Sequence, residues 1–222
     1  RIRLTATPTG QVPNTSAPAA SPGSDLNGSA AQAAARTLKE RLIAFAAERH
    51  QAAPCEVTWL PGAVAVKGAT IPFDALVREA YLARVQLSAT GFYRTPEISW
   101  DRAAGRGRPF FYFAYGAACT EVTIDTLTGE HRVDRVDILH DVGRSLNPAV
   151  DLGQIEGGFV QGMGWLTCEE LWWDGQGRLR THAPSTYKIP CASDRPRDLR
   201  IELWDRPNRK PTIGRSKAVG ES

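Results

Sequence analysis

The stretch PAVDLGQIEGGFVQGMG, residues 148–164, decides the fold of this chain. Pro148 suits the first position of a helix, because the amide that proline lacks is not needed there. The following residues are apolar and rich in glycine, and we expect the helix and its continuation to cover residues 151–171. The glycines of the quoted stretch lie at positions 153, 157, 158, 162 and 164.

The glycines of this helix predict a smooth groove. Residues four apart share one face of a helix, so Gly153 aligns with Gly157, and Gly158 with Gly162. Gln154 adds an amide that both donates and accepts hydrogen bonds. The groove favours either close approach by a rigid group or tight packing against another helix. The glycine spacing does not match a dinucleotide fingerprint, and no strand leads directly into the helix.

Strand patterns lie on both sides of the helix. Upstream, residues 110–125 and 133–142 alternate in polarity around a Thr-Gly turn, which predicts an antiparallel hairpin. Downstream, Gly175 and Gly177 mark a turn before an extended, proline-rich segment at 178–196. A further strand is expected at residues 200–204.

The N-terminal half predicts a second group of elements. A helix begins at Ser24 or Asp25, since either side chain can accept hydrogen bonds from the free amides of a first turn. The other expected elements are strands at 1–7, 57–60, 64–67 and 91–93 and a short helix at 73–82. The fold class is therefore α+β, with antiparallel or mixed sheets, helices packed on one face, and two possible α/β subdomains at 1–85 and 86–222.

The loop QVPNTSAPAASPGSD, residues 11–25, leads into the first helix. Its Pro, Ser, Thr and Ala content is typical of a linker or a disordered stretch. The same loop also fits a binding role, because small residues let a ligand approach the backbone and a helix start attracts phosphate. The residues alone leave both interpretations open.

The motif SKAVGE, residues 216–221, ends in a glycine followed by a glutamate. A glycine directly before Glu221 lets the backbone turn tightly and present the carboxylate. An acid beside an apolar Ala-Val pair is a candidate for a raised pKa and hence for acid–base chemistry. The alternative is an ordinary surface glutamate after a strand.

Composition excludes several classes of protein. The 222 residues carry a net charge of +3 with both signs mixed, so there is no nucleic-acid-binding stripe. No apolar run approaches the roughly 20 residues of a membrane span, and no signal peptide is visible. We expect a piece of a longer polypeptide, because the chain lacks an initiator Met and stops at Ser222, directly after SKAVGE.

The cysteines give no case for a metal or disulfide framework. They are far apart and have no paired spacing, which predicts neither an iron–sulfur cluster nor a zinc site. A reducing cytoplasm is the simplest location for such a chain. The four are Cys55, Cys119, Cys168 and Cys191.

Several motifs together resemble one family. The ordered strings are SATGFYRTP (88–96), FFYFAYGAACTEV (110–122), DVGRSLNPAVDLGQIEGGFVQGMG (141–164) and PSTYKIP (184–190). With the loop and the SKAVGE motif they resemble the molybdenum-binding portion of the xanthine dehydrogenase family, which also includes xanthine oxidases and aldehyde oxidases. The resemblance runs from about Thr5 to Glu221 and is greatest to the bacterial form, in which this portion is a separate subunit.

The resemblance implies a cofactor and the residues that surround it. The cofactor is a molybdenum-pyranopterin in its sulfido form, and its dithiolene holds the metal without a protein side chain. Glu221 matches the catalytic base, and Ala20 matches the residue beside molybdenum. The other residues matched to cofactor binding are Ala19, Ser21, Pro22, Gly23, Ser24, Gln154, Lys217, Ala218, Val219 and Gly220. Ser222 departs from the family pattern, which usually has proline there.

The resemblance also implies the reaction and the partners. Hypoxanthine and xanthine are oxidised to urate with oxygen from water, and electrons pass through two 2Fe-2S clusters and FAD to NAD. Those centres lie on a partner chain or segment, in a heterotetramer of two subunit types, and substrate-gripping residues lie upstream. The isolated fragment is expected to be inactive. The alternatives are an aldehyde oxidase or other molybdenum hydroxylase, and a non-catalytic binding or interface module whose polar loop is a linker.

Overall fold

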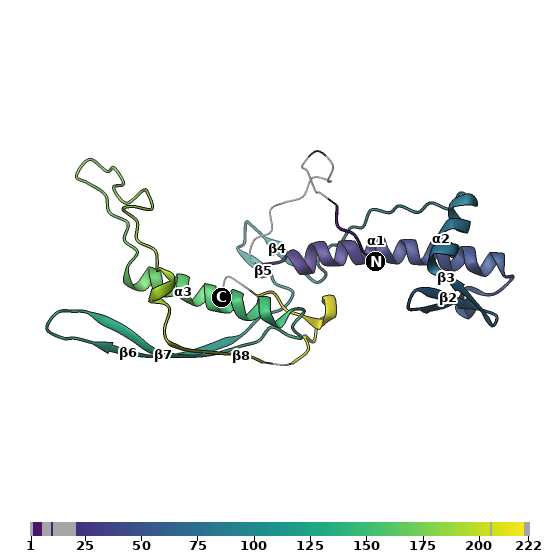
Figure 1. Cartoon of the computed structure of the whole chain (residues 1–222). Helices are drawn as coiled ribbons and strands as arrows, with labels where there is room; N and C mark the ends of the chain where they lie inside the picture. Colours follow the sequence, from purple (N-terminus) through teal and green to yellow (C-terminus); the bar gives the residue numbers. More distant parts are fainter. Residues whose placement is uncertain (1, 6–9, 11–20, 205, 220–222) are drawn as a thin grey trace.

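The computed structural model describes residues 2–5, 10, 21–204 and 206–219 (Figure 1). Its longest element is helix α1 (Gly23–Arg49), which runs between two groups of elements. The end of α1 packs against a small sheet and helix α2, whereas its first turns lie near the C-terminal part of the chain, with Gly28 against Ile213. Among the described residues, no helix has both the length and the apolar character needed to cross a membrane.

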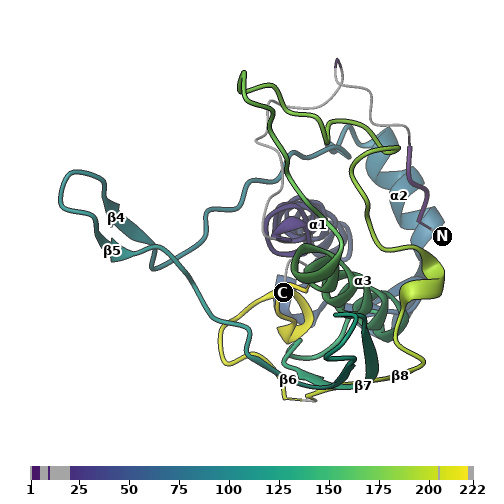
Figure 2. The same cartoon turned by 90° about the vertical axis from the view of Figure 1, so that its left-hand side faces the viewer.

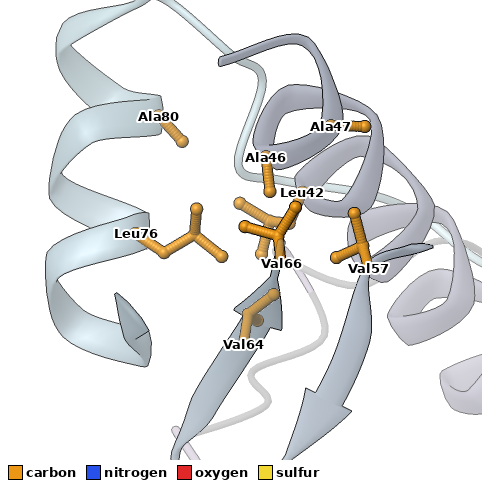
Figure 3. Packing of buried hydrophobic residues seen from close by; sticks show 8 residues of the cluster. All are labelled: Leu42, Ala46, Ala47, Val57, Val64, Val66, Leu76 and Ala80. Atoms are coloured by element: carbon orange, nitrogen blue, oxygen red, sulfur yellow. The ribbon is translucent and has the colours of Figure 1, made fainter. Parts of the chain in front are cut away.

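The N-terminal group is built around an apolar core. After the short helix η1 (Pro54–Glu56) come strands β1 (Thr58–Leu60), β2 (Ala63–Val66) and β3 (Ala69–Pro72), which form an antiparallel sheet, and helix α2 (Phe73–Leu82). Alternate residues of β2 point into the core, as the twofold periodicity of a strand requires. Figure 3 shows the core residues Leu42, Ala46, Ala47, Val57, Val64, Val66, Leu76 and Ala80.

An extended segment returns along α1 and connects the two groups. The Arg41 guanidinium donates hydrogen bonds to the carbonyl oxygens of Gln86 at 3.2 Å and Ser88 at 2.8 Å. Gly91 lies so close to α1 that a Cβ added there would be 1.8 Å from the Ala30 carbonyl oxygen. This approach requires a glycine on one side and small residues on the other. The segment ends in a hairpin of β4 (Ser99–Asp101) and β5 (Arg106–Arg108).

The C-terminal group is a three-stranded sheet under one helix. Strand β6 (Gly116–Ile124) pairs antiparallel with β7 (His131–His140), which pairs parallel with β8 (Asp198–Leu203). Helix α3 (Pro148–Thr167) lies over one face of this sheet and packs against β8 (Figure 2). The short helices η2 (Ala192–Asp194) and η3 (Ile213–Arg215) lie before and after β8.

The expected α+β class with antiparallel or mixed sheets is confirmed. Helix α2 has the predicted bounds, α3 begins at Pro148, and the hairpin at the Thr-Gly turn is present, with Gly129 at a φ of +79°. The division into subdomains at 1–85 and 86–222 stays a prediction.

Other expectations about local structure were wrong. Residues 2–5 form no strand, because they pair with no described strand and Ile2 is 92% exposed. Residues 91–93 form no strand either, since Gly91 lies directly against α1 and Phe92 is exposed. Helix α1 begins with Pro22 at the N-cap, two residues before Ser24, and α3 ends at Thr167, where the chain turns back toward Pro190. The alternation of polarity missed β3, β4 and β5, which have three or four residues each.

Candidate functional site

Three segments distant in sequence surround one cleft of about 340 Å³. The first is the start of α1 from Ser21 to Asp25, the second is the first turns of α3 with the residues before them, and the third is residues 216–219. The end of the loop from Ser21, the start of the glycine-rich helix and residues 216–219 of the SKAVGE motif therefore meet in space, although Ser21 and Val219 are 198 positions apart in the chain.

The first wall presents the start of α1. No side chain among the described residues caps this helix, and the N-cap is a proline, which has no side-chain acceptor. The amides of the first turn therefore have no capping partner from a described side chain. Ser21 has a φ of 55°, a conformation uncommon for a residue with a Cβ, and it turns the chain into the helix. This wall offers N–H donors and the positive end of the helix dipole.

The second wall is the open face of α3. Gln154 is exposed and contributes to the cleft. A Cβ added to Gly153, Gly157 or Gly162 would meet nothing within 4 Å, so these glycines leave a smooth surface in the described part of the chain. Tight packing occurs instead at Gly164, where an added Cβ would be 2.6 Å from Pro190 Cδ. The α3 residues that line the cleft are Val150, Asp151 and Gln154, and these glycines leave the helix surface open outside it.

The third wall is the segment before Gly220. Its backbone is held by hydrogen bonds from Lys217 N to Val142 O at 2.8 Å and from Asn208 Nδ2 to Ser216 O at 3.1 Å. The segment is extended but forms only a single bridge, between Ser216 and Gly143. Asn208 and Ser216 are buried, so the hydrogen bond between them holds this wall on the side that faces the protein interior.

The Lys217 ammonium group is engaged inside the protein. It forms an ion pair with Asp141 and donates a hydrogen bond to Phe113 O at 2.8 Å. Its side chain is only 12% exposed. The resemblance matched Lys217 to cofactor binding. Because its ammonium group is engaged by Asp141 and Phe113, Lys217 contributes to the cleft with its backbone more than with its charge.

Tyr112 connects the first and third walls. Its hydroxyl donates a hydrogen bond to the Asp25 carboxylate and accepts one from the Ala218 amide at 2.7 Å. Burial raises the pKa of Asp25, although the hydrogen bond from Tyr112 opposes this effect. Burial, followed by the hydrogen bond to Asp25, raises the pKa of Tyr112 well above its ordinary value, so Tyr112 stays protonated.

The candidate residues from the sequence divide into two sets. Of those that the structure describes, seven line the cleft and Pro22 adjoins it as the N-cap; the seven are Ser21, Gly23, Ser24, Gln154, Lys217, Ala218 and Val219. Ala19, Ala20, Gly220 and Glu221 lie outside the described residues. Their contacts with a cofactor stay predictions.

Sequence reasoning missed three residues of this site: Asp25 as a cleft residue, Tyr112 and Asp141. Asp25 was considered only as a helix cap, and Tyr112 was read as part of a strand pattern. The aspartate before Val142 carried no signal of its own. The sequence signal that could have indicated Asp25 was its place as an acid in the first turn of a helix, where a carboxylate interacts favourably with the helix dipole.

Comparison with known proteins gives a consistent result. The family described as molybdopterin cofactor-binding domain matches residues 1–196. Xanthine dehydrogenase/oxidase of Rattus norvegicus is 46% identical over 222 residues, covering 100% of this chain and 15% of the relative. Aldehyde oxidase 1 of Oryctolagus cuniculus is 43% identical over 223 residues, with 100% and 15% covered.

A solved structure shares the fold. The crystal structure of the Cu,Mo-CO dehydrogenase in its carbon monoxide reduced state matches with a TM-score of 0.78 and 22% identity, covering 96% of this chain and 26% of that chain. The chain therefore spans about a quarter of the length of that structure. It spans only 15% of the length of the two relatives named above.

Proposed function

We propose that this chain, which belongs to the molybdopterin cofactor-binding domain family, builds part of the molybdenum site of a xanthine dehydrogenase, with Glu221 as the general base. The observation that carries the proposal is the single cleft that joins the start of α1, the first turns of α3 with Gln154, and residues 216–219. Glu221 follows Val219 by two residues and Ala20 directly precedes Ser21, so both are covalently tied to walls of this cleft.

The described walls suit a phosphorylated, rigid cofactor. The uncapped first turn of α1, at Gly23 and Ser24, would hold the phosphate, because its N–H groups and the helix dipole both favour an anion. Gln154 would donate and accept hydrogen bonds at the other wall of the cleft. No group of three or more His, Cys, Asp or Glu side chains among the described residues could hold a metal, so the cofactor itself would supply the metal's ligands.

Glu221 supplies proton transfer in this proposal. The bound cofactor would take up the two electrons released when an electron-poor carbon of the substrate is hydroxylated. The Glu221 carboxylate would take the proton from the oxygen nucleophile as it attacks that carbon. Residues 216–219 are held by buried hydrogen bonds, so they would keep the carboxylate in place during the transfer.

The proposed substrates are hypoxanthine and xanthine, with urate as the final product. The strings GFYRTP and PSTYKIP favour the xanthine branch over the aldehyde branch. Identity alone separates the two branches poorly, at 46% and 43%. An aldehyde oxidase is therefore the second candidate. Electrons would leave through two 2Fe-2S clusters and FAD on a partner chain or segment, in a cytoplasmic assembly of two subunit types.

The decisive test compares Glu221→Gln with the unchanged complete protein. We expect kcat for xanthine to fall by at least about 10²- to 10⁴-fold, the range for loss of a general base, while molybdenum content stays the same. Glu202→Gln, at an exposed position on β8, is the matched control and should keep full activity. Normal turnover of Glu221→Gln would disprove the assignment of the base.

Two further measurements separate the alternatives. A higher kcat/KM for an aromatic aldehyde than for xanthine would replace the substrate assignment with the second candidate. Absence of molybdenum from the purified protein, together with rapid proteolysis between Gln11 and Ser24, would favour a non-catalytic interface module.

A further inference from the structure

We propose that Tyr112 is a positioning residue that couples the two walls of the cleft, holding residues 216–219 at a set distance from the start of α1. It does so with one hydroxyl, which donates to Asp25 and accepts from the Ala218 amide at 2.7 Å. The consequence for Glu221 rests on the proposed function, whereas the coupling itself does not.

The direction of the two hydrogen bonds is determined by chemistry. A tyrosine hydroxyl has one proton to donate and lone pairs that accept. The Ala218 N–H can only donate, so the hydroxyl must accept from it. The single hydroxyl proton is then left for the Asp25 carboxylate. Asp25 thus orients the hydroxyl, and the hydroxyl in turn orients the backbone at Ala218. A phenylalanine at position 112 could make neither bond.

The segment that carries Tyr112 supports residues 217 and 218 together. The carbonyl oxygen of Phe113, the next residue, accepts a hydrogen bond from the Lys217 ammonium at 2.8 Å. Asp141 holds the same ammonium from β7's end. Lys217 and Ala218 are therefore bound to the neighbouring residues Phe113 and Tyr112. Of these two contacts, the one through Tyr112 also reaches α1.

The positions of the two partners give this coupling its significance. Asp25 directly follows Ser24, the residue matched to the phosphate-binding turn, and Ala218 precedes Glu221 by three residues. The hydroxyl of Tyr112 thus bridges the wall proposed to hold the cofactor and the segment proposed to carry the base. Misplacement of a catalytic group by about 1 Å can cost about 10²-fold in rate.

The first experiment measures the coupling without relying on turnover. In the complete, cofactor-loaded protein, Tyr112→Phe should speed hydrogen–deuterium exchange at the Ala218 amide by about 2- to 12-fold, the factor that corresponds to one lost hydrogen bond. Tyr93→Phe is the matched control. Tyr93 lies near Asp25, yet no hydrogen bond links its hydroxyl to 216–219 in the described residues. Exchange at Ala218 should be unchanged in this control.

The second experiment asks whether the coupling positions the base. Tyr112→Phe should lower kcat for xanthine by about 10- to 100-fold with a smaller change in KM and unchanged molybdenum content. Asp25→Asn keeps an acceptor for the Tyr112 hydroxyl, whereas Asp25→Ala removes it. We therefore expect Asp25→Asn to retain more of kcat than Asp25→Ala, and a merely structural role of Asp25 would not require this difference.

Each outcome has a distinct meaning. Unchanged exchange at Ala218 in Tyr112→Phe overturns the coupling. Faster exchange with unchanged kcat overturns the positioning role. A wild-type protein that lacks molybdenum or hydroxylase turnover defeats the proposed function instead, and the exchange measurement still decides whether the two walls are coupled.

Discussion

The two groups of elements are stabilised in different ways. The N-terminal group buries eight apolar residues in one cluster between α1, β2 and α2. In the group that carries the cleft, every residue of β6 is exposed, and Trp165 and Leu166 on α3 are 77% and 88% exposed. Its cleft wall is held by hydrogen bonds and an ion pair. The comparison teaches that one end of α1 rests on a compact apolar core, whereas the cleft wall at the other end adds polar contacts with definite directions to a smaller set of buried apolar residues.

The largest effect on stability should come from the apolar core. Leu76 is 2% exposed, and Leu76→Ala should cost about 2–5 kcal/mol because it removes buried methyl groups and leaves a cavity. Hydrogen exchange in β1–β3 should accelerate strongly, while exchange at residues 216–219 stays unchanged. Leu82→Ala, at a position 70% exposed on the same helix, is the control. Equal acceleration in both groups would break the comparison, since it would mean that they unfold as one unit.

The polar region should respond most to loss of the Lys217 charge. Lys217→Met keeps the apolar stem but leaves Asp141, with its side chain 17% exposed, without its cation. We expect a cost of about 1–3 kcal/mol, below the value for a fully buried pair because both groups keep some contact with water. Thermal unfolding and exchange at residues 216–219 would measure it. Lys210→Met is the comparator, because its partner Glu97 is more exposed; an equal loss in both would contradict the special role of the Lys217 pair.

The smallest effect should be a pH-dependent change at Asp25. Burial raises the pKa of this carboxyl, so the folded protein binds its proton more readily than the unfolded chain does. The ionised form therefore costs stability above the folded pKa, and that cost is relieved as the pH falls through it. Asp25→Asn, which cannot ionise, should unfold at a slightly higher temperature than wild type at pH 8, with the difference shrinking toward pH 4. A difference of the opposite sign at pH 8 would show that the hydrogen bond from Tyr112 outweighs burial.

Local signals predicted the regular elements with the clearest patterns. The proline at position 148 indicated the start of α3, and Thr128-Gly129 indicated the turn of the long hairpin, because both depend on the conformational limits of single residues. The short strands β3, β4 and β5 were missed because their residues show no clear alternation, whereas the equally short β1 and β2 were predicted from their apolar residues. The parallel partner of β7 could not be foreseen either, since register between β7 and β8 is a tertiary property.

The candidate site was predictable only in part. Glycine spacing and the SKAVGE motif indicated that the segments were unusual, but their meeting in one cleft was implied by family resemblance and not by spacing. The contact between Tyr112 and Asp25 spans 87 residues and depends on how α1 lies against the returning segment. No sequence pattern around Asp25 or around Tyr112 predicts that the two side chains meet.

The parallel pairing of β7 with β8 has a consequence for biosynthesis. Arg135 pairs with Asp198, so the sheet cannot be completed until α3 and the long connection after it have left the ribosome. Residues 216–219 emerge later still. The third wall of the cleft is therefore the last of its three walls to be synthesised.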